Sequence, residues 1–71
     1  MGQEEKKNSL RAYREQIFLS KAELARKAGI SPLTMKRIES GKSCRLETKR
    51  KIILALGLEL SEAGKIFGDD N

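Results

Sequence analysis

The chain has 71 residues, of which 38% are hydrophobic and 35% charged, a size and composition that fit one small folded domain. It contains no histidine, no tryptophan and a single cysteine, which excludes histidine-based catalysis, Cys/His metal sites and catalytic triads. We therefore expect a protein that is not an enzyme and that needs no metal or other cofactor. The net charge of +5 is concentrated in residues 21–51, which carry ten basic and three acidic side chains. Such a segment attracts a polyanion, although an ordinary solvated helical surface has a similar composition.

The single Cys44 cannot form a disulfide within the chain and suits a reducing compartment. Because no histidine could activate its thiol, we interpret Cys44 as a small residue at the surface or at the edge of the core. No run of apolar residues is long enough to cross a membrane, and residues 1–9 lack the apolar stretch of a secretion signal. We expect a cytoplasmic protein without a membrane partner.

The first two predicted helices are marked by different signals. The first helix should begin near Asn8 or Ser9, because apolar residues then recur on one helix face: Leu10, Tyr13 and Ile17. The second begins at a capping box, in which the Ser20 hydroxyl accepts from the Glu23 amide and the Glu23 carboxylate accepts from the Ser20 amide. This second helix should end at Gly29, which adopts a positive φ at little cost.

A third helix is predicted to follow almost at once. Ser31 is a good N-cap, and Pro32 fits the first helical position, where its missing N–H costs nothing. Gly41 ends this helix. The side chains expected to form the core behind the turn are Leu24, Ile30, Met35 and Ile38. Two short helices joined by a tight turn with a glycine have the geometry of a helix-turn-helix.

Two more helices are predicted after the polar loop of residues 40–45. The start of the fourth helix is poorly defined, because no residue there is a good cap. This helix should end at Gly57 and direct four residues toward the core: Leu46, Ile52, Ile53 and Leu56. Ser61 is expected to cap a short fifth helix that carries Ile66 and Phe67 and ends at Gly68.

The predicted fold class is all-α, with five short helices and no strand. We expect a flexible N-terminal segment at residues 1–9, one domain at residues 10–68 and a frayed tail at residues 69–71.

Residues 20–42 resemble the helix-turn-helix of the phage repressor/Cro (Xre-type) family of DNA-binding domains. The matching positions are Ser20, Leu24, Ala25, Gly29, Ile30, Ser31, Thr34, Met35, Ile38, Glu39 and Gly41. The resemblance extends over about residues 10–67 and implies a lambda-repressor-like helix-turn-helix domain. In this family the carboxylate at the position of Glu39 pairs with an arginine of the first helix, which by position is Arg14. The resemblance thus implies a structural ion pair, with a solvated Glu39 as the alternative.

The resemblance also implies which residues contact DNA. Contacts to bases are expected from Leu33, Thr34, Lys36 and Arg37. Contacts to phosphates are expected from Ser20, Lys21, Ser31, Lys42, Ser43 and Arg45, with backbone amides at Ser20–Lys21 and around Leu46. The chain departs from the family at Lys21, which replaces the usual glutamine, and at Pro32 and Leu33, which cannot hydrogen-bond to a base edge. Hydrogen-bonding readout is then left to Thr34, Lys36 and Arg37, with Arg37 as the expected guanine contact.

The expected function is that of a sequence-specific transcription regulator that binds double-stranded DNA with helix 31–40 in the major groove. A homodimer through Leu60 and Ala63 is expected on DNA, and Leu54 is expected to be exposed near that surface. No small-molecule effector is expected, because the chain has no room for a sensor domain. The alternative is a protein-binding module, of antitoxin or adaptor type, on the same fold; the apolar pair Pro32–Leu33 favours it.

Overall fold

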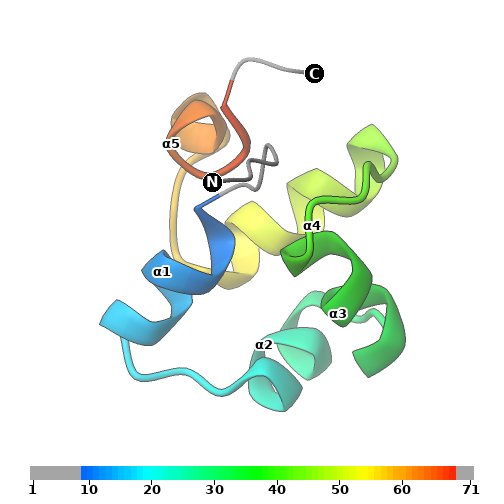
Figure 1. Cartoon of the computed structure of the whole chain (residues 1–71). Helices are drawn as coiled ribbons and strands as arrows, with labels where there is room; N and C mark the ends of the chain where they lie inside the picture. Colours follow the sequence, from blue (N-terminus) through cyan, green and yellow to red (C-terminus); the bar gives the residue numbers. More distant parts are fainter. Residues whose placement is uncertain (1–8, 69–71) are drawn as a thin grey trace, which may run out of the picture.

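The computed structural model describes residues 9–68, which form five α-helices and one 3₁₀ turn and contain no strand (Figure 1). In chain order these are α1 (Leu10–Gln16), α2 (Lys21–Ala28), α3 (Pro32–Glu39), α4 (Leu46–Ala55), the turn η1 (Leu60–Glu62) and α5 (Ala63–Phe67). The predicted all-α class is confirmed. The segment expected to be flexible, residues 1–9, and the tail at residues 69–71 lie outside the described range, except for Ser9.

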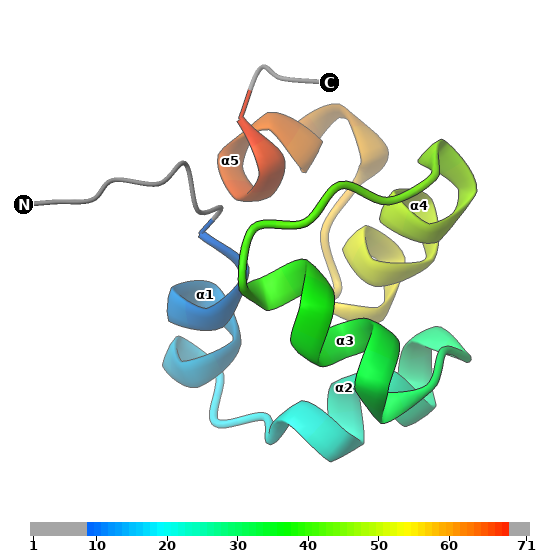
Figure 2. The same cartoon turned by 45° about the vertical axis from the view of Figure 1, so that its right-hand side comes forward.

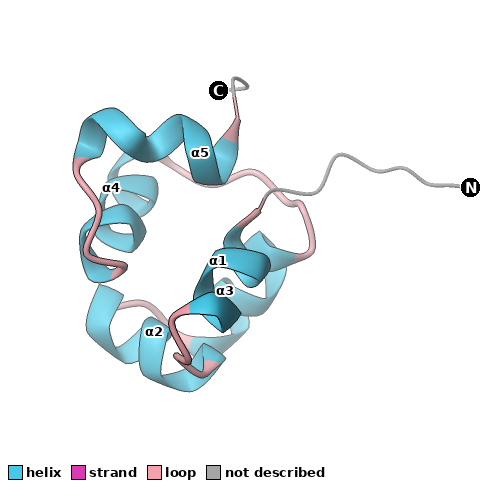
Figure 3. Ribbon diagram, turned by 90° about the vertical axis from the view of Figure 1, so that its left-hand side faces the viewer, coloured by secondary structure: helices cyan, strands magenta, loops and turns pink. Residues whose placement is uncertain are grey.

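The core is a single cluster of apolar side chains to which all five helices contribute. Its buried members are Leu10, Leu24, Ala25, Ala28, Met35, Ile38, Ile52, Ile53, Leu56 and Ile66. α2 packs against both α3 and α4, and Figure 2 shows α3 lying in front of α2. α5 lies at the opposite end of the molecule from α2 (Figure 3). α1 contacts α5, and the backbone N–H of Ser9 donates to the carbonyl of Ile66 at 2.9 Å, which ties the first helix to the last.

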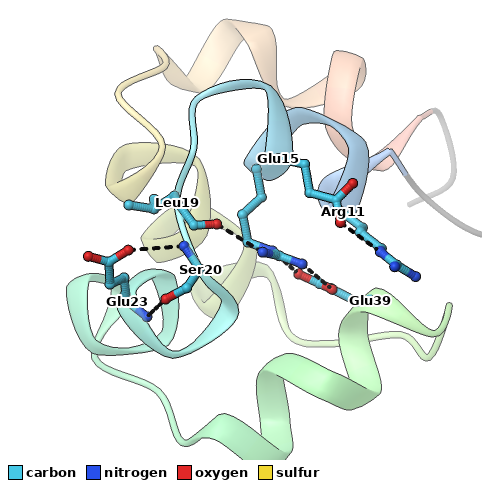
Figure 4. A network of polar contacts seen from close by, with 7 residues as sticks. Arg11, Glu15, Leu19, Ser20, Glu23 and Glu39 are labelled. Carbon is cyan, nitrogen blue, oxygen red and sulfur yellow. Dashed lines mark hydrogen bonds and ion pairs between the residues drawn. The ribbon is translucent and has the colours of Figure 1, made fainter.

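The helix boundaries around the central turn follow the predicted capping signals. Ser20 Oγ accepts from the Glu23 amide and Glu23 Oε1 accepts from the Ser20 amide, each at 3.0 Å (Figure 4). Gly29 has a φ of 73°, the left-handed conformation that a residue with a side chain rarely adopts. Ser31 Oγ accepts from the Thr34 amide at 3.1 Å, and Pro32 is the first residue of α3. The short turn between α2 and α3 is therefore specified by local interactions.

Two residues predicted to face the core are exposed. Ile17 lies beyond α1, which ends at Gln16, so the helical spacing that placed Ile17 on the buried face no longer applies. Leu46 is 74% exposed although it lies on the same face of α4 as the buried Ile53. Leu46 lines a recess between α4 and α5, whose residues leave most of its side chain uncovered. Periodicity fails at Ile17 because the helix has ended, whereas at Leu46 it gives the face but not what lies opposite that face.

The predicted cap of the last helix is also wrong. Ser61 lies inside η1, and the cap is formed two residues earlier, where the Glu59 amide donates to Glu62 Oε1 at 2.9 Å. The physical reason is that η1 runs directly into α5, so the helical segment begins at Leu60 and needs its cap before that residue. The amide of Glu59 lowers the pKa of the Glu62 carboxyl below its usual value.

Candidate nucleic-acid interface

An ion pair between Arg14 and Glu39 joins α1 to α3. Arg14 Nε donates to Glu39 Oε2 at 2.7 Å, and Arg14 Nη2 donates to Glu39 Oε1 at 3.3 Å, so the contact is bidentate (Figure 4). Arg14 Nη1 also donates to the carbonyl of Leu19 at 2.8 Å, just before α2. The two side chains are 8% and 6% exposed, so water screens the pair little. The structure thus brings together the two residues implied by the resemblance and fixes α3 relative to the chain that enters α2.

The N-terminus of α2 has two backbone donors available to a ligand. The Ser20 amide, predicted to be a donor to phosphate, is not available, because the capping box uses the amides of Ser20 and Glu23. The amides of Lys21 and Ala22 have no acceptor among residues 9–68. The Ser20 amide lowers the pKa of the Glu23 carboxyl, so this carboxylate remains charged and in its cap at neutral pH. The exposed ammonium of Lys21 adds positive charge beside the available amides. This combination is suited to bind a phosphate.

The outer face of α3 carries the residues predicted to contact bases. Leu33 is 63% exposed, and Lys36 and Arg37 are exposed as well. Thr34 is half-buried, and its Oγ1 accepts a hydrogen bond from the Ser31 hydroxyl at 2.9 Å. Ser31 therefore caps α3 and orients Thr34, and its predicted contact with a phosphate stays a prediction.

A recess of about 350 Å³ between α3 and the following loop brings predicted base and phosphate contacts together. Its lining residues are Thr34, Arg37, Ile38, Lys42, Ser43 and Cys44. The Lys42 amide donates to the carbonyl of Arg37 at 3.1 Å, which holds the loop against the helix. Two cationic side chains and two hydroxyls favour an anion in this recess. Burial raises the pKa of the Cys44 thiol, so it stays protonated at neutral pH and supplies no reactive thiolate.

The N-terminus of α4 is a second group of available donors. Arg45 occupies the N-cap position without a side-chain hydrogen bond, as the poorly defined start of this helix predicted. The amides of Leu46, Glu47 and Thr48 have no acceptor within the described part of the chain. In Figures 1 and 2, α3 lies between this helix start and the start of α2. The exposed face of α3 is thus flanked by two helix N-termini that can each bind an anion.

The residues predicted for self-association lie at the α4–α5 end of the molecule. Leu60 is exposed and borders an apolar recess of about 270 Å³ between α4 and α5. Lys49 Nζ lies 5.5 Å from the centre of the Phe67 ring at this recess, a cation–π contact. Ala63 is half-buried and packs against the core, so part of its side chain contributes to the fold. Leu54 is exposed, whereas Leu58 packs against the core.

One exposed residue close to the start of α2 was missed. Phe18 follows α1, has a φ of 57° and is 91% exposed. The sequence does indicate that Phe18 lies in a short turn, because it falls between the end of the first helix and the capping box at Ser20.

Within residues 9–68, no helix is long and apolar enough to cross a membrane. The same residues contain no group of acidic or cysteine side chains that could hold a metal ion.

Comparison with known proteins identifies the family. A family model described as a helix-turn-helix domain matches residues 8–64, which covers α1 through α4 and reaches the start of α5. A search of curated proteins finds no match. The helix pair α2–α3, the glycine turn between them, α1 and α4 all lie within the matched segment. The chain therefore belongs to the helix-turn-helix family of the phage repressor/Cro (Xre) type, whose members are DNA-binding domains.

Proposed function

We propose that this chain is a sequence-specific transcription regulator that binds double-stranded DNA with residues 31–40 in the major groove. The observation that carries the proposal is the exposed face of α3, flanked by the uncapped amides at the starts of α2 and α4. B-DNA has the complementary form, since its major groove admits one α-helix and phosphates follow both edges. The proposal includes no catalytic step and places the protein in the cytoplasm.

Base readout in this proposal comes from three kinds of side chain. Arg37 reaches guanine, whose O6 and N7 accept two hydrogen bonds from one guanidinium. Leu33 contacts thymine methyl groups, since it is exposed and has no polar atom. Thr34 is held by Ser31 next to Arg37, in the same recess, which supports a contact with a neighbouring base edge. Lys36 is exposed on the same helix and completes the set.

Phosphate binding in this proposal occurs on both sides of α3. On one side, the amides of Lys21 and Ala22 and the Lys21 ammonium hold one strand, with the Ser20 hydroxyl as a further donor. On the other side, the amides at the start of α4 act together with Lys42, Ser43 and Arg45 on the opposite strand. Contacts of this kind position the protein and carry no sequence information.

Binding of duplex DNA over a salt series tests the proposal. The logarithm of affinity should fall linearly with the logarithm of salt concentration, because each phosphate contact releases counterions. Alanine at Lys21, Lys42 or Arg45 should weaken binding about equally on all sequences and flatten this slope by roughly one unit. Lys65→Ala, on α5, is the matched control and should leave the slope unchanged. A wild-type chain that shows no salt-dependent binding to any duplex would overturn the proposal.

Selection from random duplexes tests the readout by Arg37. Arg37→Ala should relax the preference at one base position, at a cost of about 1–3 kcal/mol for the preferred base. An equal loss of affinity on every sequence would instead make Arg37 a contact to the DNA backbone.

We further propose that the chain binds DNA as a dimer through Leu60, because one recognition helix covers too few base pairs for tight discrimination. The exposed Leu60 and the apolar recess beside it support this surface. Leu60→Asn should then weaken binding to a two-site duplex and leave binding to a half-site unchanged. Equal affinity of the wild type for both duplexes would contradict pairing.

A second candidate function, a protein-binding module, is favoured by the 63% exposure of Leu33, an apolar side chain in the first turn of α3. The same salt series separates the two candidates, since a protein-binding module needs no affinity for duplex DNA.

A further inference from the structure

Phe18 has two unfavourable properties for a residue of an isolated domain. Its φ of 57° lies in the left-handed region, where the side chain of a bulky residue crowds the backbone. Its side chain is 91% exposed, so it gains almost nothing from burial. A glycine or asparagine would suit this turn better on both counts. Phe18 therefore adds little to the stability of the folded domain through burial.

The position of Phe18 relative to α2 indicates what it contacts. Phe18 and Ser20 are two residues apart, so their Cα atoms are separated by at most about 7 Å. Leu19, between them, packs against the core, which leaves Phe18 and Ser20 on the solvent side of the chain. Phe18 thus lies on the solvent side of the chain three residues before Lys21, whose available amide and that of Ala22 are proposed to bind a phosphate.

The charges around Phe18 favour a polyanion. The Lys21 ammonium is exposed, and no described acidic group is paired with it. Of the carboxylates close in sequence, Glu15 pairs with Arg11 at 3.1 Å, whereas Glu23 keeps its charge and is held in the cap by the Ser20 amide. An apolar ring beside unpaired positive charge matches a nucleic acid strand, which alternates phosphates with apolar sugar faces. An acidic protein would match this surface only if it also presented an apolar side chain to Phe18.

We propose that Phe18 is an apolar anchor that packs on the deoxyribose next to the phosphate held at the start of α2. This inference rests on the proposed binding of duplex DNA. Phe18 then adds affinity that does not depend on sequence or on salt, because the contact buries apolar surface and neutralises no phosphate. The strained backbone holds the ring outside the protein, ready for this contact.

The test is Phe18→Asn, measured by duplex binding over the same salt series. Asparagine tolerates a positive φ, so this variant should melt at or above the temperature of the wild type. Its affinity for DNA should fall about 5- to 30-fold, the effect expected from exposing part of one aromatic ring, by the same factor at every salt concentration. Phe18→Tyr keeps the ring and should bind within about twofold of the wild type. On a half-site duplex, where the proposed pairing plays no part, Leu54→Asn removes another exposed apolar side chain far from α2 in sequence and should also bind like the wild type.

The outcomes separate this inference from the function on which it rests. Wild-type affinity of Phe18→Asn, with normal binding by the wild type, would overturn the anchor and leave the proposed function intact. A flattened salt slope, such as that expected for Lys21→Ala, would also overturn it, because a phosphate contact would then have been lost. If the wild type binds no duplex, both proposals fail together.

Discussion

The two ends of this small domain are held together by different kinds of contact. At the end that contains α1, α2 and α3, polar groups with strict geometry act in addition to apolar packing, chiefly the pair Arg14–Glu39 and the capping box at the start of α2. At the other end, α4 and α5 meet through apolar side chains, with Lys49 over Phe67 as the exception. Large apolar side chains are exposed at both ends of the domain. Those at the α4–α5 end are Leu46, Leu54 and Leu60.

This difference has a functional meaning. A bidentate ion pair and an N-cap each satisfy their donors in one geometry only, so they set the orientation of α3. Apolar contacts have no preferred direction and adapt to a changed neighbour more easily. The end that must present side chains to a ligand is thus the one with directional contacts, and the other end has apolar surface available for pairing.

The largest expected effect comes from breaking the buried ion pair. Glu39→Gln should lower the free energy of unfolding by about 3–5 kcal/mol, because Arg14 would remain as a buried charge without its partner. Urea denaturation with a fitted slope measures this change. Glu15→Gln is the control, since it breaks a pair with Arg11 whose side chains are 71% and 56% exposed and should cost less than about 1 kcal/mol.

The double replacement Arg14→Met with Glu39→Leu sharpens this prediction. It removes both charges together, so it should be more stable than Glu39→Gln alone. An unchanged melting temperature for Glu39→Gln would show that the pair does not hold α1 to α3 in solution.

Adjacent residues of α4 test the apolar end. Ile53 is completely buried, and Ile53→Ala should cost about 2–5 kcal/mol, which includes the cavity that it leaves. Leu54, the next residue, is exposed, and Leu54→Ala should change stability by no more than about 0.5 kcal/mol. Thermal unfolding of both variants measures the contrast. Similar costs at the two positions would mean that α4 is rotated relative to the core.

A smaller effect is expected from the helix caps. Ser20→Ala removes the acceptor of the Glu23 amide and should cost about 1 kcal/mol. Ser61→Ala should have almost no effect, because Ser61 lies within η1 and forms no described hydrogen bond through its side chain. Denaturant unfolding of the two alanine variants distinguishes a serine that caps from one that only resembles a cap in the sequence.

The smallest expected effect is the pH dependence of the capping carboxylates. The pKa of Glu23 is lowered by the Ser20 amide, and that of Glu62 by the Glu59 amide. A lowered pKa in the folded state means that each cap stabilises fully above the pKa of the unfolded chain. The contribution is lost as the pH falls through the folded-state value. The stability difference between the wild type and Glu23→Gln should therefore shrink in acid, and a difference that grows below pH 4.5, the reference value for this carboxyl, would contradict the cap.

The sequence predicts the central turn well because its signals are local. Ser20 and Glu23 are three residues apart and cap each other, and Gly29 supplies the positive φ that the turn requires. The contact between Arg14 and Glu39 joins residues 25 positions apart, so it was implied by the family resemblance rather than by any local pattern.

The exposed residues Leu46 and Phe18 show where prediction from one sequence ends. Helical spacing gives the face of Leu46 but not whether another element packs opposite that face. Phe18 contradicts the preference for glycine or asparagine at a positive φ, so no propensity predicts its conformation. The exposure of both side chains depends on their neighbours in the folded structure, and the spacing of residues along the chain does not specify those neighbours.

The most direct test of the proposed interface is an amide NMR titration of the labelled chain with a selected duplex. The account predicts the largest shift changes at the amides that lack an acceptor, those of Lys21 and Ala22 in α2 and of Leu46, Glu47 and Thr48 in α4. Residues on the outer face of α3 should shift with them, whereas the amide of Leu54 should not. Shift changes concentrated at the α4–α5 recess, with the starts of α2 and α4 unaffected, would contradict it.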